Sequence, residues 1–393
     1  MPKIIETTPA ALSPRPNFLG NCETAKLGSC DNKSVKTLHF TVDPAQLETP
    51  GAQADLEQAA EILRAGGLVA LPTETVYGLG ANALDRRAVE RIFAAKQRPA
   101  WDPIIVHIAS EEMLATLVTD IPETARKLIA AFWPGPLTLL LPRSAAVPDA
   151  VTAGRPLVGV RMPAHSVALA LIRAANLPIA APSANRFGHT SPTTAAHVLA
   201  DLDGRIDAVL DAGPAAHGVE STVLDPCRTP MLIYRPGAVT AEQIGAVAGA
   251  VEIFRPSGPL LHADDTAENA SMQALPSPGV GLRHYAPKAR LVLIDAPFAA
   301  LKEKIAEAAQ HHSSERLGIL LPEEIPARGL NLRALDAVLF PWGRWTEPST
   351  LAHGLYAGLR SLDDQGCTVI LCPLPLEDEI GAAIRDRLRK AAS

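Results

Sequence analysis

The chain has 393 residues and a formal net charge of −6 at pH 7, with 47% apolar and 20% charged residues. This composition is typical of a globular protein, and the length exceeds one ordinary hydrophobic core, so we expect two domains with connecting segments. The negative charge argues against a broad nucleic-acid-binding surface and leaves only a local basic patch open. No uncharged apolar run reaches the roughly 18 residues of a membrane span.

Targeting and metal signals are weak. The first residues, "MPKIIETTPAALSPRPNF", have neither an apolar signal core nor a high arginine content, which predicts a cytoplasmic protein. The five cysteines form no CxxC pair, as expected for reduced structural thiols. His311 and His312 follow an alanine-rich segment, which indicates a solvated helix end. We therefore expect no metal site built from protein ligands.

In chain order, residues 1–46 show little periodicity and are interpreted as an extension that adds at most one strand, near "TLHFTV". Residues 47–245 are predicted to form the first domain. In it "DLEQAAEILRAGG" predicts a helix that Gly66 ends, and "RRAVERIFAAKQRP" a helix that stops near Arg98, before proline. Many short apolar runs surround these helices, which predicts an α/β domain with a large mixed sheet.

Residues 246–287 are rich in proline, glycine and small polar residues and are predicted to be a linker. Apolar strand patterns then alternate with helical ones over residues 288–393, which predicts a small doubly wound, Rossmann-like domain with a parallel sheet.

Two cationic residues lie at the C-terminal end of the second predicted helix. Lys96 takes the next position on the stripe formed by Val89, Ile92 and Phe93, where a lysine can simply extend to water. Arg98 follows in the extended segment before proline. Two cations at a helix end suit an anionic ligand, and arginine can hold a phosphate or carboxylate with two hydrogen bonds. The chain has no Walker motif, and "GLGANA" lacks the third glycine of a dinucleotide fingerprint.

The run "LVGVRM" predicts a strand with Leu157, Gly159 and Arg161 on one face. The arginine there faces either a ligand, for which the glycine leaves room, or solvent at a sheet edge. His107 alternates with Ile105 in "PIIVHIA", where a structural histidine is the ordinary interpretation.

Polar residues gather where predicted strands end. "AAPSANRFGHTSPTTAAHV" ends a strand on Ser183 and Asn185, and Ser191 before Pro192 predicts a helix start. Free N–H groups at a helix start, with hydroxyls and an amide nearby, suit a phosphate. Thr73, Glu74, Thr75 and Tyr77 follow another predicted strand, and Glu220, Ser221 and Thr222 precede one. Thr240 and Gln243 predict a capping box, which places Arg235 in the turn before a helix.

Together these segments resemble the L-threonylcarbamoyl-adenylate synthase family in its two-domain form. The motifs are "PTETVYGLGANA", "KQR" with "PIIVHI", "RMP" with "APSAN" and "SPTTAAHV", "GVESTV" with "RPGAV", and the linker "SPGVGLRHYAPKA". The resemblance implies a twisted mixed sheet with a concave cavity. It implies that L-threonine, bicarbonate and ATP, with Mg²⁺ accompanying ATP, give threonylcarbamoyl-AMP and pyrophosphate. The product would serve tRNA-modification proteins that act on adenosine 37 of tRNAs reading ANN codons.

The resemblance also implies roles for residues at matching positions. Catalytic positions are Lys96, Arg98, Ser183 and Asn185. Threonine-binding positions are Thr75, His107, Arg161, Ala181 and Ser221. ATP-binding positions are Arg98, Asp102, Leu157, Ser183, Ser191, Arg235 and His284. The family often has asparagine where this chain has Asp102, and threonine where it has Leu157. An acidic residue near ATP would weaken nucleotide binding unless it faces a metal or another cation.

The linker suggests a role of its own, and two other functions compete with the one that the resemblance implies. The segment 275–287, with Arg283, His284 and Tyr285, is expected to act as a lid over the nucleotide, with a docking strap as the plainer alternative. The alternative functions are an RNA-binding module of the same fold and a carbamoyltransferase-related adenylating enzyme. The absence of an aromatic and basic RNA motif counts against the first, and the absence of CxxC modules against the second.

Overall fold

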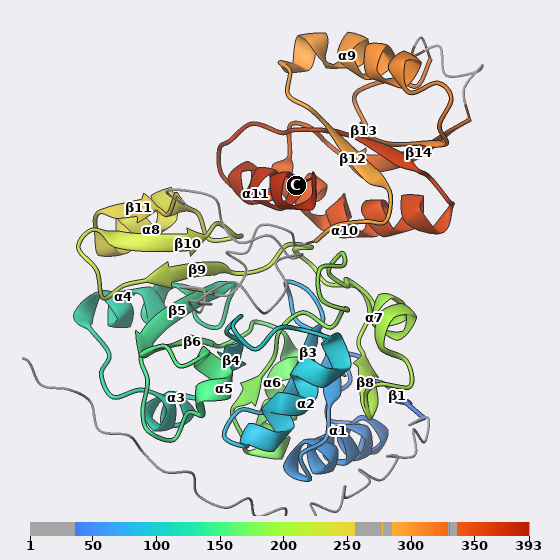
Figure 1. The fold of residues 1–393 in the computed structure, drawn as a ribbon. Helices are drawn as coiled ribbons and strands as arrows, with labels where there is room; N and C mark the ends of the chain where they lie inside the picture. Colours follow the sequence, from blue (N-terminus) through green and yellow to red (C-terminus); the bar gives the residue numbers. More distant parts are fainter. Residues whose placement is uncertain (1–35, 256–276, 278–284, 329, 331–335, 393) are drawn as a thin grey trace, which may run out of the picture. The chain divides into compact units, whose positions relative to one another are not determined.

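The computed structural model describes residues 36–255, 277, 285–328, 330 and 336–392, which belong to one compact unit. Within these residues the strands form an 11-stranded mixed sheet and a 4-stranded parallel sheet (Figure 1). The predicted fold class is therefore confirmed. We call residues 36–255 the large-sheet region and the described residues of 288–392 the small-sheet region.

The large sheet has the order β1-β8-β2-β3-β7-β4-β6-β5-β9-β10-β11. Its strands are β1 (Leu38–Thr41), β2 (Val69–Leu71), β3 (Gly78–Asn82), β4 (Ile105–His107), β5 (Leu137–Pro142), β6 (Leu157–Arg161), β7 (Ile179–Ala180), β8 (Ala208–Asp211), β9 (Thr222–Asp225), β10 (Met231–Arg235) and β11 (Val251–Ile253). The helices are α1 (Pro50–Arg64), α2 (Arg86–Lys96), α3 (Glu111–Leu117), α4 (Glu123–Phe132), α5 (Asp149–Thr152), α6 (Ser166–Ala175), α7 (Ala195–Leu202) and α8 (Ala241–Ala248).

Alternation along the strands puts apolar side chains on both faces of the large sheet. In β2, Val69 and Leu71 pack with α1 and α6, while Ala70 belongs to the core on the opposite face, with α2 and α7. Because both faces are covered, polar residues collect where strands end, and these ends are where a site can form.

Local signals set most helix boundaries. Thr49 caps α1, and Gly66, at φ +80°, follows it in a left-handed conformation. Thr240 and Gln243 form the predicted capping box of α8. The helix start predicted at Ser191 is wrong, because Thr194 is the N-cap of α7 and accepts from the His197 N–H.

The sheet extends beyond the predicted edges of the first domain. β1 lies within the predicted extension and pairs in parallel with β8, as the pattern near "TLHFTV" suggested. At the other end, α8 runs to Ala248 and β11 pairs in parallel with β10, so regular structure continues past residue 245. Both strands are short edge strands, which carry little periodicity for a sequence pattern to reveal.

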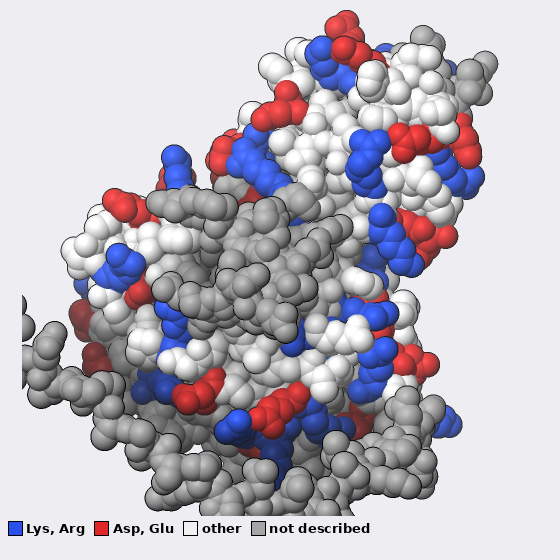
Figure 2. Space-filling model, in the orientation of Figure 1, with Lys and Arg blue, Asp and Glu red and all other residues white. Residues whose placement is uncertain are grey.

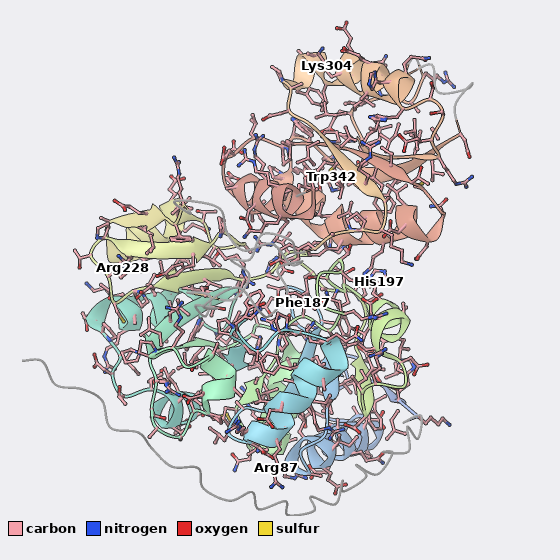
Figure 3. All side chains as sticks on the ribbon, in the orientation of Figure 1. Arg87, Phe187, His197, Arg228, Lys304 and Trp342 are labelled. Atoms are coloured by element: carbon pink, nitrogen blue, oxygen red, sulfur yellow. The ribbon has the colours of Figure 1, made fainter. Side chains whose placement is uncertain are left out.

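The small sheet has the order β12-β15-β13-β14, with every pair parallel. Its elements are β12 (Arg290–Ile294), α9 (Phe298–His311), β13 (Leu317–Pro322), β14 (Ala337–Gly343), α10 (Pro348–Asp364), β15 (Val369–Pro373) and α11 (Gly381–Ala392). Helix α9 packs on one face, with Val369 and Leu371, while α10 and α11 pack on the other, with Ile370 and Cys372 (Figure 1). Trp342 is buried there, and its indole N–H donates to the carbonyl of Leu351 (2.8 Å; Figure 3).

None of the helices in the described residues is long and apolar enough to cross a bilayer.

Candidate functional site

A pocket in the large-sheet region lies where β4, β6, β7, β9 and β10 begin or end. Its lining is completed by the segment after β2 and by Tyr285. Eight predicted site residues line it: Thr75, Arg98, His107, Arg161, Ala181, Ser183, Ser221 and Arg235. Lys96, Asp102, Leu157, Asn185 and Ser191 are not among the described residues of this lining. His284 and Arg283 lie outside the described residues, so the lid remains a prediction there.

Arg161 occupies the end of β6 and is 3% exposed, which is a buried guanidinium and not one facing solvent at a sheet edge. Its Nε donates to the carbonyl of Gly135 (3.1 Å), its Nη1 to the Thr75 hydroxyl (3.0 Å), and its Nη2 pairs with Glu74 (2.5 Å). Burial alone would raise the pKa of Glu74, but the charge of Arg161 holds it below its usual value. A guanidinium has five N–H groups, so two remain for a ligand carboxylate.

His107 lies beside Arg161, because β4 pairs in parallel with β6 and the two residues are in register. Burial and the positive charge of Arg161 lower the pKa of His107 to about 3, so its ring is neutral at physiological pH. Its Nδ1 has no hydrogen-bond partner among the described residues. The ring is therefore a neutral group in the pocket wall with an unused nitrogen, a feature that suits a polar ligand.

Arg98 follows α2, and Asp102 neutralises it. Arg98 Nη2 pairs with the Asp102 carboxylate (2.9 Å), and the side chains are 7% and 0% exposed. The same nitrogen donates to the carbonyl of Pro103 (2.8 Å). The acidic departure from the family pattern thus faces a cation inside the protein, which answers the concern that its charge would repel a nucleotide.

Lys96 is 1% exposed, so the plain interpretation of a lysine extending to water is wrong. Its ammonium donates to the carbonyls of Ser183 (2.5 Å) and Asn185, across 87 and 89 residues of chain. Burial and the nearby charge of Arg98 hold the pKa of Lys96 well below its usual value. Lys96 therefore supports the backbone that carries two other predicted site residues.

Ser183 and Asn185 lie on the segment that follows β7. Ser183 makes a bridge with Gly78 and lines the pocket. The Asn185 amide donates to the carbonyls of Arg186 and His189 (both 2.8 Å), while its Oδ1 has no hydrogen-bond partner among the described residues. The two predicted neighbours thus differ: one faces the pocket, and the other closes a turn behind it.

Glu220 connects two predicted site residues that lie in different loops. The Ser191 hydroxyl donates to Glu220 Oε1 (2.6 Å). Next to Glu220, Ser221 receives two hydrogen bonds on its carbonyl from Arg235 (3.0 and 3.1 Å), and its hydroxyl lies 2.8 Å from that of Thr138. Ser191 therefore contacts Glu220, whereas Ser221 and Arg235 form part of the pocket wall itself.

Leu157 lies at the start of β6 and lines a separate small cavity with Pro103, Ile104 and Gly159, among others. It packs on Ile105 and the neighbouring apolar cluster. As predicted, it shares the strand face of Gly159 and Arg161, but its side chain does not reach the pocket lining.

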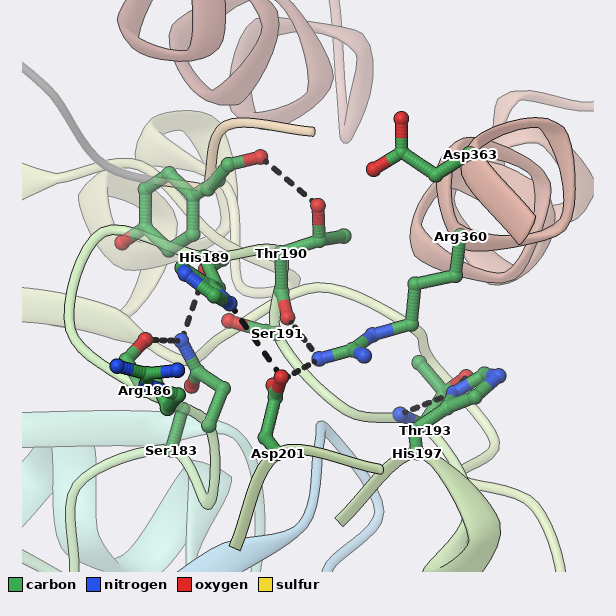
Figure 4. Close-up of polar contacts among 12 residues, drawn as sticks. Ser183, Arg186, His189, Thr190, Ser191, Thr193, His197, Asp201, Arg360 and Asp363 are labelled. Atoms are coloured by element: carbon green, nitrogen blue, oxygen red, sulfur yellow. Dashed lines mark hydrogen bonds and ion pairs between the residues drawn. The ribbon is translucent and has the colours of Figure 1, made fainter. Parts of the chain in front are cut away.

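A polar cluster outside the pocket holds the loop before Ser191. Arg360 of α10 donates to the Thr190 carbonyl and pairs with Asp201 (2.7 Å), which also lies 3.3 Å from His189 Nδ1 (Figure 4). The Thr190 hydroxyl donates to the carbonyl of Tyr285 (3.3 Å). Burial alone would raise the pKa of Asp201, but His189 and Arg360 lower it to about 2.

This cluster predicts a defined acid sensitivity. Because the folded pKa of Asp201 lies below its usual 3.8, the ion pair stabilises the fold above that pH, and the contribution disappears as pH falls toward 2. Asp201→Asn should therefore flatten the decline in the free energy of unfolding between about pH 5 and pH 2, by about 1 kcal/mol after allowance for solvent screening. Urea unfolding across this range measures it. Asp336→Asn, in the exposed pair with Arg316, should leave the slope unchanged. Parallel curves for Asp201→Asn and the parent would contradict the assignment.

Sequence reasoning missed two residues next to the site. Tyr356 and Arg387, from α10 and α11, contact Glu220, and Arg387 also lies over the Tyr285 ring. One signal was present: Ile384, Arg387 and Ala391 follow helical spacing, so a charged residue interrupts the apolar stripe of the last helix. Nothing in the local pattern of Tyr356 distinguishes it from a core residue.

The described residues contain no group of three or more His, Cys, Asp or Glu side chains that could hold a metal ion.

Comparisons with known proteins cover both regions. A family model described as telomere recombination matches residues 61–237, and one described as the C-terminal domain of threonylcarbamoyl-AMP synthase matches residues 239–393. A threonylcarbamoyl-AMP synthase of Pyrococcus abyssi is 43% identical over 336 residues, or 85% of this chain and 93% of the relative. One from Bacillus subtilis is 42% identical over 360 residues, or 91% of this chain and 98% of the relative.

A solved structure also matches most of the chain. The crystal structure of P. abyssi Sua5 complexed with L-threonine matches with a TM-score of 0.79 and 40% identity, and it covers 91% of this chain and 98% of that chain. The likeness therefore extends over both sheets and not over one of them alone.

Proposed function

The chain belongs to the threonylcarbamoyl-AMP synthase family, and on that premise we propose that it makes L-threonylcarbamoyl-AMP from L-threonine, bicarbonate and ATP. Pyrophosphate is the second product, so the enzyme is a nucleotidyltransferase that transfers AMP to a carbamate. A relative of known structure binds L-threonine. The observation that carries the proposal is one pocket that combines a buried arginine, Arg161, with two further arginines, Arg98 and Arg235.

Threonine fits the part of the pocket around Arg161. The two unused N–H groups of Arg161 hold the amino-acid carboxylate, since a guanidinium binds carboxylates with two parallel hydrogen bonds. Thr75, Ala181 and Ser221 line the same pocket and would contact the remainder of the ligand. The neutral His107 ring adds a polar contact without a second positive charge, so it does not repel the amino group.

ATP would occupy the part of the pocket near Ser183, Arg98 and Arg235. Asp102 balances the Arg98 charge, and Arg235 adds a further positive charge that suits the phosphates. Lys96 and Asn185 support the backbone on which Ser183 lies, while Ser191 acts through Glu220. His284 stays a predicted contact from outside the described residues. Mg²⁺ would enter with ATP, on its phosphate oxygens.

The chemistry needs positioning and charge rather than a covalent enzyme intermediate. The neutral amine of threonine attacks bicarbonate, forming the N–C bond of a carbamate and releasing water. A carbamate oxygen then attacks the α-phosphorus of ATP, and the bond to the β-phosphate oxygen breaks as pyrophosphate leaves. Such transfers depend on alignment and on stabilisation of the developing charge. The arginines of the pocket supply that charge.

The product would be consumed by proteins that modify adenosine 37 of tRNAs reading ANN codons, in the cytoplasm. An RNA-binding module is the competing function. On the face drawn in Figure 2, basic and acidic side chains of the described residues are interspersed, and no broad basic patch is visible there. This distribution favours a small-molecule substrate, because RNA binding relies on clustered positive charge.

The test is product formation by the purified chain without RNA. We expect a threonylcarbamoyl-AMP peak by mass spectrometry and an equal amount of pyrophosphate, both dependent on L-threonine, bicarbonate and ATP. Omission of bicarbonate and replacement of L-threonine by L-valine, which lacks the hydroxyl, are the controls. Failure to form the adenylate together with tight tRNA binding would favour the RNA-binding alternative. Carbamoyl transfer from carbamoyl phosphate without threonine would favour the transferase alternative.

A further inference from the structure

Two helices of the small-sheet region reach the wall of the pocket through one carboxylate. Glu220 is 6% exposed. Its Oε2 accepts from Arg387 Nε of α11 (2.7 Å) and from the Tyr356 hydroxyl of α10 (2.9 Å). Its Oε1 accepts from the Ser191 hydroxyl (2.6 Å). Every donor around this carboxylate is therefore buried, and two of them come from the small-sheet region.

Arg387 is 1% exposed and also contacts Tyr285, a second residue of the pocket wall. Its guanidinium carbon lies 5.3 Å from the centre of the Tyr285 ring, and that ring stacks on Tyr356 with centroids 5.8 Å apart. Tyr285 in turn lines the pocket. The cation and the aromatic ring packed against Tyr285 restrict its position.

The loop that carries Glu220 lies directly on α10. Gly218, at φ +72°, has no space for a side chain, because a Cβ there would lie 2.5 Å from the carbonyl oxygen of Ala352. His353 Nδ1 lies 3.0 Å from the carbonyl oxygen of Ala216 in the same loop. The contact thus includes backbone as well as side chains, so the loop and the helix hold each other in place.

The charged groups around Glu220 indicate how its ion pair with Arg387 affects the pocket. Burial alone would raise the pKa of Glu220, but the charges of Arg387 and Arg235 hold it at about 2. Arg387 forms the ion pair with Glu220, whereas Arg235 donates to the neighbouring Ser221, and of the two arginines only Arg235 lines the pocket. While Arg387 neutralises Glu220, Arg235 remains available to a ligand. Without Arg387, a buried carboxylate has to be compensated by the nearest other cation.

We propose that Arg387 is a positioning residue for the nucleotide half of the site, acting through Glu220 and Tyr285. Its ion pair with Glu220 keeps Arg235 directed toward the ligand, and its contact with the Tyr285 ring fixes the edge of the pocket. The small-sheet region thereby completes the site without contacting substrate. This inference rests on the proposed function only for the identity of the ligand, ATP.

The test compares Arg387→Met with Arg385→Met, using isothermal titration of ATP and of L-threonine with the full chain. Arg385 is the matched control, because it lies on the same helix, is 8% exposed, and pairs with Asp295 (2.7 Å) within the small-sheet region. We expect Arg387→Met to weaken ATP binding about 10- to 100-fold, as for loss of a charge-assisted contact, with L-threonine binding changed by less than about threefold. Arg385→Met should leave both affinities unchanged.

The double variant Glu220→Gln, Arg387→Met should recover most of the ATP affinity, because the uncompensated charge is gone and Arg235 is released. A general loosening of the small-sheet region would instead weaken both ligands and would appear in Arg385→Met as well. Any one of three results would overturn the proposal. They are weaker binding of both ligands, unchanged ATP affinity in Arg387→Met, and failure of the double variant to recover ATP affinity.

Two further points keep the test decisive. If Arg387→Met fails to fold, Tyr356→Phe removes the hydroxyl that donates to Glu220 and should still weaken ATP binding selectively, though less. If the parent chain binds ATP and L-threonine but forms no adenylate, the proposed function fails while the positioning role is still measured by binding.

Discussion

We expect Arg161→Met to raise the L-threonine KM about a hundredfold, since loss of a charge-assisted contact costs about 2–3 kcal/mol, with a smaller effect on the ATP KM. The arginine is held by Gly135, Thr75 and Glu74, and these contacts leave two of its five N–H groups for a ligand. Methionine keeps much of the length and removes every donor. Steady-state kinetics with either substrate varied measures the effect.

The same substitution should also destabilise the fold. Glu74 is 6% exposed, and without Arg161 its carboxylate is buried without a compensating charge, at a cost of about 3–5 kcal/mol. The double variant Glu74→Gln, Arg161→Met should restore most of the free energy of unfolding but not the L-threonine KM. Arg143→Met is the control, because its partner Asp149 is 75% exposed and needs no compensating charge. An unchanged L-threonine KM in Arg161→Met would mean that the carboxylate binds elsewhere.

Lys96→Met should reduce kcat at least about a hundredfold, comparable to the loss of a positioning contact in the transition state, with a smaller change in the L-threonine KM. The ammonium bonds the carbonyls of Ser183 and Asn185, so its removal frees the backbone that presents Ser183 to the pocket. Each buried carbonyl left without a donor costs about 1–3 kcal/mol, so the free energy of unfolding should fall as well.

Arg86→Met, on the first turn of the same helix, is the matched control, since its pair with Glu90 is exposed and should contribute little. Rapid-quench measurement of adenylate formation isolates the chemical step from product release. Lys96→Met with unchanged kcat and a lowered melting temperature would mean that Lys96 stabilises the fold without organising the site.

The sequence alone determined those features that depend on neighbours within a few residues. Three local predictions were confirmed. They are the apolar stripe of α1 with Gly66 after it, the capping box of Thr240 and Gln243, and the alternation that places Gly159 and Arg161 on one face of β6. Helical and strand periodicity is a local property, so it can be read directly from the chain. The motif order indicated the family, and the comparisons confirmed it.

Tertiary structure decided what each site residue contacts. Ser191 was predicted to begin a helix, but its hydroxyl bonds Glu220, 29 residues away, and Thr194 caps α7 instead. Lys96 could have extended to water, yet it bonds carbonyls more than 80 residues away. Arg387 of α11 contacts Glu220 across 167 residues, between the small-sheet and large-sheet regions. Such pairs depend on how separate elements pack, and a buried charge persists only where packing supplies its partner, so local pattern cannot reveal them.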